Sequence, residues 1–139
     1  MCIRDRFYNL NMCMAYGLPA FVQDATAYAL EHDEHTAIVV RDKLMRNRDV
    51  VKEVLSHMHG AHLYAEGGGM FAVLDVRPLG RSSSEFAWGL LNEQKISLLP
   101  CDGFGSSGQG LLRIGLCLDE DTLRTAAQRI LAYVETVAG

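Results

Sequence analysis

Arg113 is the residue whose type and surroundings most clearly suggest chemistry. It stands inside the apolar run 111–117, Leu-Leu-Arg-Ile-Gly-Leu-Cys, which has the pattern of a buried strand. A guanidinium is costly to bury without an anionic partner, and its planar fork can bind a carboxylate through two parallel hydrogen bonds. Arg113 is therefore a candidate carboxylate-binding residue. The alternative is a structural ion pair with Asp75 or Asp102.

Residues 103–108, Gly-Phe-Gly-Ser-Ser-Gly, match the G-x-G-x-x-G pattern of dinucleotide-binding loops. In such loops the glycines open a helix whose N-terminus holds the pyrophosphate, whereas the run that follows here has the pattern of a strand. A kinase glycine loop does join two strands, but the catalytic-loop and metal-binding signatures of kinases are absent. Gly67–Gly69 also precede a predicted strand. We therefore interpret both glycine clusters as turns.

Histidines and serines give no second site. His57 and His59 are two residues apart near a predicted helix end, so their rings point in different directions, and no cysteine is close in sequence. We interpret them as solvated side chains rather than zinc ligands, together with His32, His35 and His62. The serines at 82–84 and 106–107 show neither a G-x-S-x-G elbow nor a Ser-x-x-Lys pair, so nothing supports a serine nucleophile.

Composition limits the possible functions. The 139 residues carry a formal net charge of -4, and the longest basic run is Arg46-Asn47-Arg48, so we expect no nucleic-acid partner. No apolar stretch approaches the roughly 20 residues of a membrane span, and a soluble, cytoplasmic protein is expected. The cysteines are too widely spaced for a metal or redox motif and are expected to be reduced. They are Cys2, Cys13, Cys101 and Cys117.

The order of helix and strand patterns predicts an α+β fold, with helices packed on a small sheet. A helix is expected around 20–30, a second from a cap at Asp33 to Gly60, a third from the Ser82–Glu85 capping box to about Lys95, and a fourth from Asp119. Residues 16–19 are expected to form a turn or helix start. Strands are expected at 62–66, 70–76, 96–99 and 111–117, the third stopped by Pro100.

Three stretches carry short motifs in a particular order. They are 21–25 (Phe-Val-Gln-Asp-Ala), 68–75 (Gly-Gly-Met-Phe-Ala-Val-Leu-Asp) and 96–114, in which Ile-Ser-Leu-Leu-Pro and Gly-Phe-Gly precede Gly-Leu-Leu-Arg-Ile. Together they resemble the C-terminal part of class I/II aminotransferases of fold type I, with their Phe-x-Gln-x-Ala segment, Gly-x-Phe strand, Pro-Gly-x-x-Phe-Gly turn and Gly-x-x-Arg strand. Cys101 stands where that family usually has glycine, a departure that leaves Arg113 in register.

Residues 1–6 fit neither a helix nor a strand pattern and are expected to be a non-native N-terminal scar, with a genuine N-terminus as the alternative. The resemblance implies a division of the remaining chain. Residues 7–30 would be a lead-in segment and helix from the end of the large domain, and residues 31–139 the C-terminal small domain of the pyridoxal-phosphate-dependent transferase fold.

The resemblance also implies a function. Arg113 would bind the α-carboxylate of an amino-acid substrate, and pyridoxal 5'-phosphate would serve transfer of an amino group between an amino acid and a 2-oxo acid. A homodimer is implied for the full-length protein. The family's cofactor lysine lies upstream in a Ser-x-Ser-Lys context, which Lys43, Lys52 and Lys95 lack. No catalytic or cofactor-binding residue is therefore assigned in this chain, and we expect the chain alone to be inactive.

Two alternatives remain. An amino-acid lyase or decarboxylase of the same fold would share the carboxylate-binding arginine. A stand-alone, non-enzymatic α+β binding module would instead pair Arg113 internally.

Overall fold

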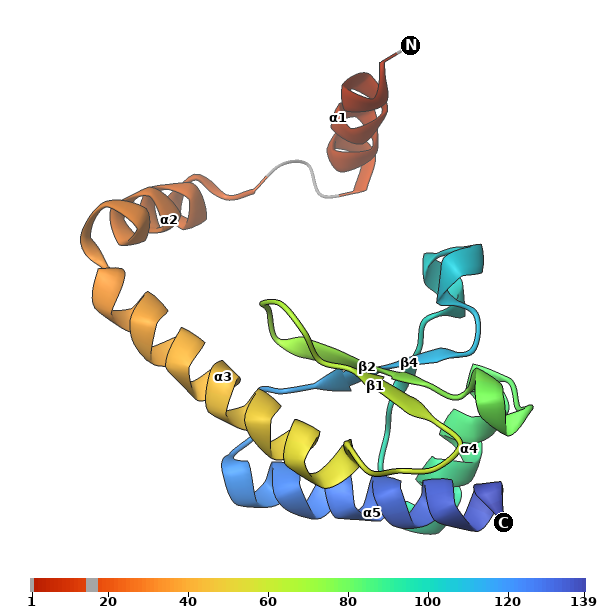
Figure 1. Cartoon of the computed structure of the whole chain (residues 1–139). Coiled ribbons are helices and arrows are strands. Elements are labelled where there is room, and N and C mark those ends of the chain that lie inside the picture. The colour runs from red at the N-terminus through yellow and green to blue at the C-terminus, as the bar shows by residue number, and fades with distance from the viewer. Residues whose placement is uncertain (1, 15–17) are drawn as a thin grey trace. The chain divides into compact units, whose positions relative to one another are not determined.

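The computed structural model describes residues 2–14 and 18–139, and the chain forms two compact units, Met1–Val39 and Val40–Gly139 (Figure 1). Its helices are α1 (Ile3–Met14), α2 (Ala20–His32), α3 (Glu34–Leu55), α4 (Ser83–Gln94) and α5 (Glu120–Ala138). Its strands are β1 (His62–Tyr64), β2 (Phe71–Asp75), β3 (Leu99–Pro100) and β4 (Leu111–Gly115). Three short 3₁₀ turns are η1 (Arg77–Leu79), η2 (Asp102–Phe104) and η3 (Ser106–Gly108).

The first unit contains α1, α2 and the first turn of α3. Neither α1 nor α2 has a buried residue. The expectation that residues 1–6 form neither helix nor strand was wrong for residues 3–6, which lie in α1. Of the turn expected at 16–19, residues 16 and 17 lie outside the described part, and Pro19 is the residue before α2. The division of the chain at residue 30 stays a prediction.

Local caps begin the helices where the sequence predicted them. The carboxylate of Asp33 accepts a hydrogen bond from the Thr36 amide at 2.9 Å, and this bond holds the pKa of Asp33 below its usual value. Ser82 and Glu85 form the predicted capping box at the start of α4. Helix α3 ends at Leu55, earlier than the expected stop at Gly60, which has a left-handed φ of 80° in the following turn.

The second unit contains an antiparallel sheet with the strand order β1-β2-β4-β3. Strands β1, β2 and β4 lie within the predicted ranges. The third prediction was wrong in its bounds, because 96–98 are irregular and Pro100 lies within β3 rather than stopping it. Since β3 is an edge strand, the missing amide hydrogen of a proline there costs no bond within the sheet.

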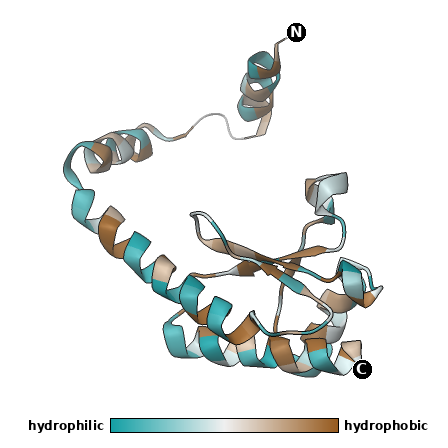
Figure 2. Cartoon of the chain, viewed as in Figure 1, coloured by the Kyte–Doolittle hydropathy of each residue, from teal (hydrophilic) through white to brown (hydrophobic). Residues whose placement is uncertain are grey.

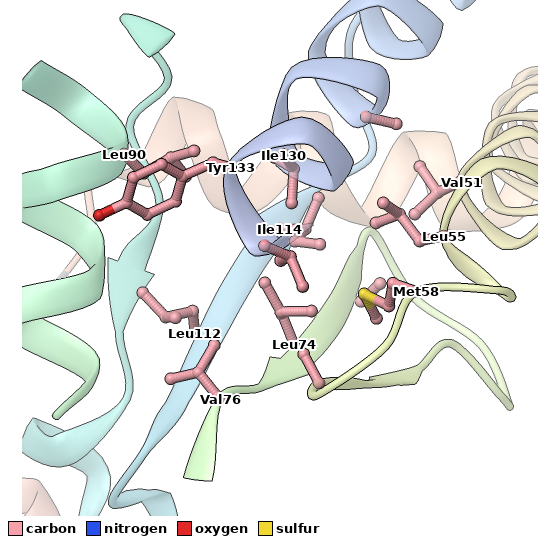
Figure 3. Packing of buried hydrophobic residues seen from close by; sticks show 14 of the residues in the cluster. Val51, Leu55, Met58, Leu74, Val76, Leu90, Leu112, Ile114, Ile130 and Tyr133 are labelled. Atoms are coloured by element: carbon pink, nitrogen blue, oxygen red, sulfur yellow. The ribbon is translucent and has the colours of Figure 1, made fainter. Parts of the chain in front are cut away.

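The hydrophobic core lies between one face of this sheet and helices α3, α4 and α5 (Figure 1). Alternate residues of the central strands are buried, and much of β2 and β4 is coloured hydrophobic in Figure 2. Full burial of each leucine or isoleucine is worth about 1.5 to 3 kcal/mol. Side chains of this layer, drawn in Figure 3, include Val51, Leu55, Leu74, Leu90, Leu112, Ile114, Ile130 and Tyr133.

Helices α4 and α5 pack closely at one point. The rings of Phe86 and Tyr133 meet edge to face, with centroids 5.0 Å apart, and a side chain at Gly89 would collide with the Tyr133 hydroxyl. The predicted α+β architecture, a small sheet with helices packed on it, is confirmed. None of the helices in residues 2–14 and 18–139 is long and apolar enough to cross a membrane.

Candidate functional site

Arg113 lies on the face of the sheet that points away from the core. Its neighbours along β4, Leu112 and Ile114, are buried in the core, so the alternation of the strand directs Arg113 to the opposite face. There it lies between Val73 of β2 and Leu99 of β3 in the strand register. This second face is only partly covered, since Tyr64, Phe71 and Leu99 are 53%, 42% and 44% exposed.

Two aromatic rings contact the guanidinium of Arg113. Its Cζ atom lies 4.1 Å from the centroid of the Phe71 ring and 5.8 Å from that of Phe104. A guanidinium over an aromatic face is attracted by the negative face of the ring, by about 0.5 to 1 kcal/mol where water has access. Such contacts use the planar faces of the group and leave the N–H donors at its edge available for a carboxylate.

Neither carboxylate proposed as a structural partner is paired with Arg113. Asp75 binds Arg77, with Oδ2 2.5 Å from Nη2 and Oδ1 accepting from Nε at 2.8 Å. Asp102 accepts a hydrogen bond from the Ser83 hydroxyl. Within residues 2–14 and 18–139 the guanidinium of Arg113 makes no hydrogen bond or ion pair. The site is therefore a partly buried cation whose carboxylate-binding edge is unused.

A buried arginine of α3 binds the backbone of residues 67–69, the segment before Phe71. Arg48, 9% exposed, donates from Nη1 to the Gly67 carbonyl at 2.6 Å and from Nη2 to the Gly69 carbonyl at 2.8 Å. Both glycines have positive φ, 80° and 93°, where a side chain would be strained. The expectation that Gly67–Gly69 belong to a connection between elements is confirmed, but they form bends between β1 and β2 rather than a hydrogen-bonded tight turn. Arg48 was missed from the sequence, because it stands in a helix face with many charged residues.

The glycine-rich connection from 103 to 108 forms two 3₁₀ turns and then leads into β4, not into a helix N-terminus. A side chain at Gly108 would collide with the Cys101 carbonyl, and Gly105 has a φ of 118°. Gly105 and Gly108 are therefore needed for the backbone conformation of this connection, and they do not form a nucleotide-binding loop. Cys101 itself is buried, and this burial raises the pKa of its thiol, while the nearby Arg113 charge partly opposes the rise.

The three lysines lie on helices or at a helix end, each with another partner. Lys52 forms an ion pair with Glu66 at 2.5 Å, Lys95 donates to the Asn92 carbonyl at 2.7 Å, and Lys43 lies 3.4 Å from the Cys117 carbonyl. In the described residues, no lysine stacks on the rings of Phe71 or Phe104, which contact Arg113. Across the described residues there is also no cluster of three or more groups that could hold a metal ion.

Comparison with known proteins finds relatives over almost the whole chain. The arginine–pyruvate transaminase AruH of Pseudomonas aeruginosa is 41% identical over 94% of this chain and 33% of its own length. The LL-diaminopimelate aminotransferase of Maridesulfovibrio salexigens is 34% identical over 82% of this chain and 29% of its own. The aromatic aminotransferase of Pyrococcus horikoshii OT3 superposes with a TM-score of 0.75 at 27% identity, over 95% of this chain and 36% of that one.

The chain belongs to the fold-type I aminotransferases. Its α+β fold matches their C-terminal domain, which confirms the family and fold expected from the three motif stretches. No protein-family model matches the chain. The chain spans about a third of the length of the curated relatives that it matches. The similarity therefore assigns the chain to the family, while the activity of a whole aminotransferase remains a proposal.

The residues that the structure describes do not form a binding site for pyridoxal phosphate. The cofactor needs a lysine that can form an imine and groups that hold its phosphate and ring nitrogen. The three lysines are engaged elsewhere, and the residues that contact Arg113 are aromatic. No catalytic step through the cofactor is therefore derived from this chain.

Proposed function

We propose that this chain supplies the substrate-carboxylate site of an amino-acid aminotransferase, in which Arg113 binds the α-carboxylate of the amino acid and of the 2-oxo acid. The observation that carries the proposal is the guanidinium of Arg113, which is oriented by an aromatic ring and has no internal anion in the described part of the chain. A carboxylate that accepts two N–H bonds from this fork would be held in one plane and at one angle.

With the carboxylate bound in this way, both substrates would have the adjacent carbon, where the amino group is transferred, at the same position. An amino acid and a 2-oxo acid share the carboxylate and differ at the adjacent carbon, so one arginine can orient both for amino-group transfer. Pyridoxal phosphate, held by the rest of the protein, would supply the electron sink. Relatives above 30% identity carry transaminase or aminotransferase names, which supports amino transfer over a lyase or decarboxylase reaction of the same fold.

A homodimer is proposed on the family resemblance, and the cytoplasm remains the expected compartment. Inactivity of the isolated chain also remains a prediction. Mixed with pyridoxal phosphate and borohydride, the isolated chain should carry no adduct on Lys43, Lys52 or Lys95. A stoichiometric adduct on one of them, with turnover, would contradict this expectation.

The function is tested with the full-length protein that contains this chain, loaded with pyridoxal phosphate. A panel of amino acids is supplied with pyruvate, and alanine, ammonia and carbon dioxide are measured together. The proposal predicts one alanine formed per amino donor consumed. Ammonia or carbon dioxide in equal amounts, without alanine, would show a lyase or a decarboxylase instead.

A further inference from the structure

Phe71 has a more specific relation to Arg113 than general packing requires. In the register of β2 and β4, Phe71 lies opposite Gly115, while Arg113 lies opposite Val73. Because Gly115 has no side chain, the Phe71 ring can lie diagonally across β4, over the guanidinium of Arg113 at 4.1 Å. Phe71 is 42% exposed, so its ring is not a member of the buried core.

The backbone before Phe71 is held in place from a different element. Arg48 binds the carbonyls of Gly67 and Gly69 at 2.6 and 2.8 Å, and this segment leads to Phe71, where β2 begins. Contacts therefore run from α3 through the segment and the phenyl ring to Arg113. Phe104 approaches the guanidinium less closely, at 5.8 Å.

An arginine without an internal anion has many rotamers, and ordering it on binding a substrate weakens that binding. A ring stacked on one face of the guanidinium removes part of this freedom beforehand. It also leaves the N–H edge uncovered, unlike a carboxylate partner, which would compete with the substrate. An aromatic side chain is thus suited to orient this arginine without occupying its binding edge.

We propose that Phe71 is a positioning residue, which stacks on the guanidinium of Arg113 and pre-orients its fork for the substrate carboxylate. This inference rests on the proposed function, because it concerns the same carboxylate site. It assigns to Phe71 an effect on carboxylate affinity that acts only through Arg113.

The test measures equilibrium binding of propionate, an unreactive carboxylate, to the full-length protein loaded with cofactor, by isothermal titration calorimetry. Propionamide, of similar shape but uncharged, is the ligand control. The variants are Phe71→Leu, Phe71→Tyr, Arg113→Ala and the double variant Phe71→Leu/Arg113→Ala. Tyr64→Leu, which removes another exposed ring on the same face of the sheet, is the matched protein control.

The positioning role predicts that Phe71→Leu weakens propionate binding about two- to fivefold, the value of one cation–π contact. Phe71→Tyr should restore wild-type affinity, and Tyr64→Leu should have wild-type affinity too. In the Arg113→Ala background, Phe71→Leu should cause no further loss. Melting temperatures of all variants, measured in parallel, identify any loss that comes from misfolding.

Three results would overturn the inference, and they separate a failure of the role of Phe71 from a failure of the proposed function. If Arg113→Ala weakens propionate binding but Phe71→Leu does not, or if Phe71→Leu weakens it equally in both backgrounds, Phe71 is not a positioning residue and the proposed function stands. If Arg113→Ala binds propionate as the wild type does, the proposed carboxylate site fails, and the role of Phe71 fails with it.

Discussion

Asp75 binds Arg77, two residues further along the chain, through both carboxylate oxygens. The Asp75 side chain is 4% exposed and that of Arg77 is 58% exposed, so at the end of the inner strand β2 a buried carboxylate is paired with a half-exposed guanidinium. Because this acid is taken up locally, it does not neutralise Arg113. The same observation disfavours the internal ion pair that a free-standing binding module would have required.

The Asp75–Arg77 pair gives a prediction on stability and pH. Hydrogen bonds from Arg77 hold the pKa of Asp75 below its ordinary value of 3.8, against the opposing effect of burial. Since the native pKa is the lower one, the pair stabilises the protein fully above about pH 4, and this stabilisation is lost as pH falls through the native pKa. Asp75→Asn should therefore lower the free energy of unfolding at pH 7 by about 1 to 2 kcal/mol.

Denaturant unfolding of both proteins from pH 7 to pH 2.5 checks this expectation. The difference between wild type and Asp75→Asn should shrink below about pH 4. Asp42→Asn, which alters the exposed Arg41–Asp42 pair, serves as the control and should change little at any pH. A difference for Asp75→Asn that stayed constant down to the lowest pH would show that its carboxylate charge is not what stabilises the fold.

Arg48 should matter for stability although it lies outside the candidate site. Arg48→Ala removes two charge-assisted hydrogen bonds and the packing of a buried stem, and we expect a loss of about 1 to 3 kcal/mol in the free energy of unfolding. Arg48→Lys should lose less, because it keeps the charge and one donor position. Amide hydrogen exchange at residues 67–70 should accelerate in Arg48→Ala. Arg46→Ala, at an exposed position of α3, is the matched control, and equal melting temperatures for the two alanine variants would refute the role of Arg48.

Cys101 should report on the charge of Arg113. Burial raises the pKa of its thiol and Arg113 partly lowers it, so the thiolate fraction at neutral pH is small and alkylation should be slow. Iodoacetamide labelling, followed by mass spectrometry of the Cys101 peptide, should be slower in the folded protein than in denaturant. It should be slower still in Arg113→Ala, with the pH midpoint moved upward. An unchanged or lowered midpoint in that variant would show that Arg113 has no influence on the thiol.

Local signals in the sequence predicted most of the second unit. Capping at Ser82 and Asp119 depends on residues three positions apart, and apolar periodicity identifies which helix faces are buried. Errors fell where a non-local partner decides the outcome. Strand β3 includes Pro100 because β3 pairs with β4 alone, and a proline is tolerated in such an edge strand. The residues 96–100 by themselves do not show that this strand lies at an edge.

The candidate site was predicted in part. A cation within an apolar run marked Arg113, but its aromatic neighbours come from β2 and η2, and their placement depends on strand register. Phe71 and Phe104 appeared in the family motifs, but the sequence offered no reason to place them beside Arg113. A diagonal pairing opposite Gly115 could have been suspected only after the register of β2 against β4 was known. Arg48 gave no distinct signal, because charged residues on a helix are usually solvated.

The most direct test of the carboxylate site compares wild type, Arg113→Lys and Arg113→Ala in the full-length, cofactor-loaded protein. With two charge-assisted hydrogen bonds at stake, each worth roughly 1.5 to 3 kcal/mol, Arg113→Ala should lower kcat/KM for the amino acid at least about a hundredfold. Arg113→Lys should be the milder loss, because it keeps the charge without the fork. Cofactor absorbance and melting temperature should barely change. Near-normal kcat/KM in a folded, cofactor-loaded Arg113→Ala protein would contradict the account and remove Arg113 from the active site.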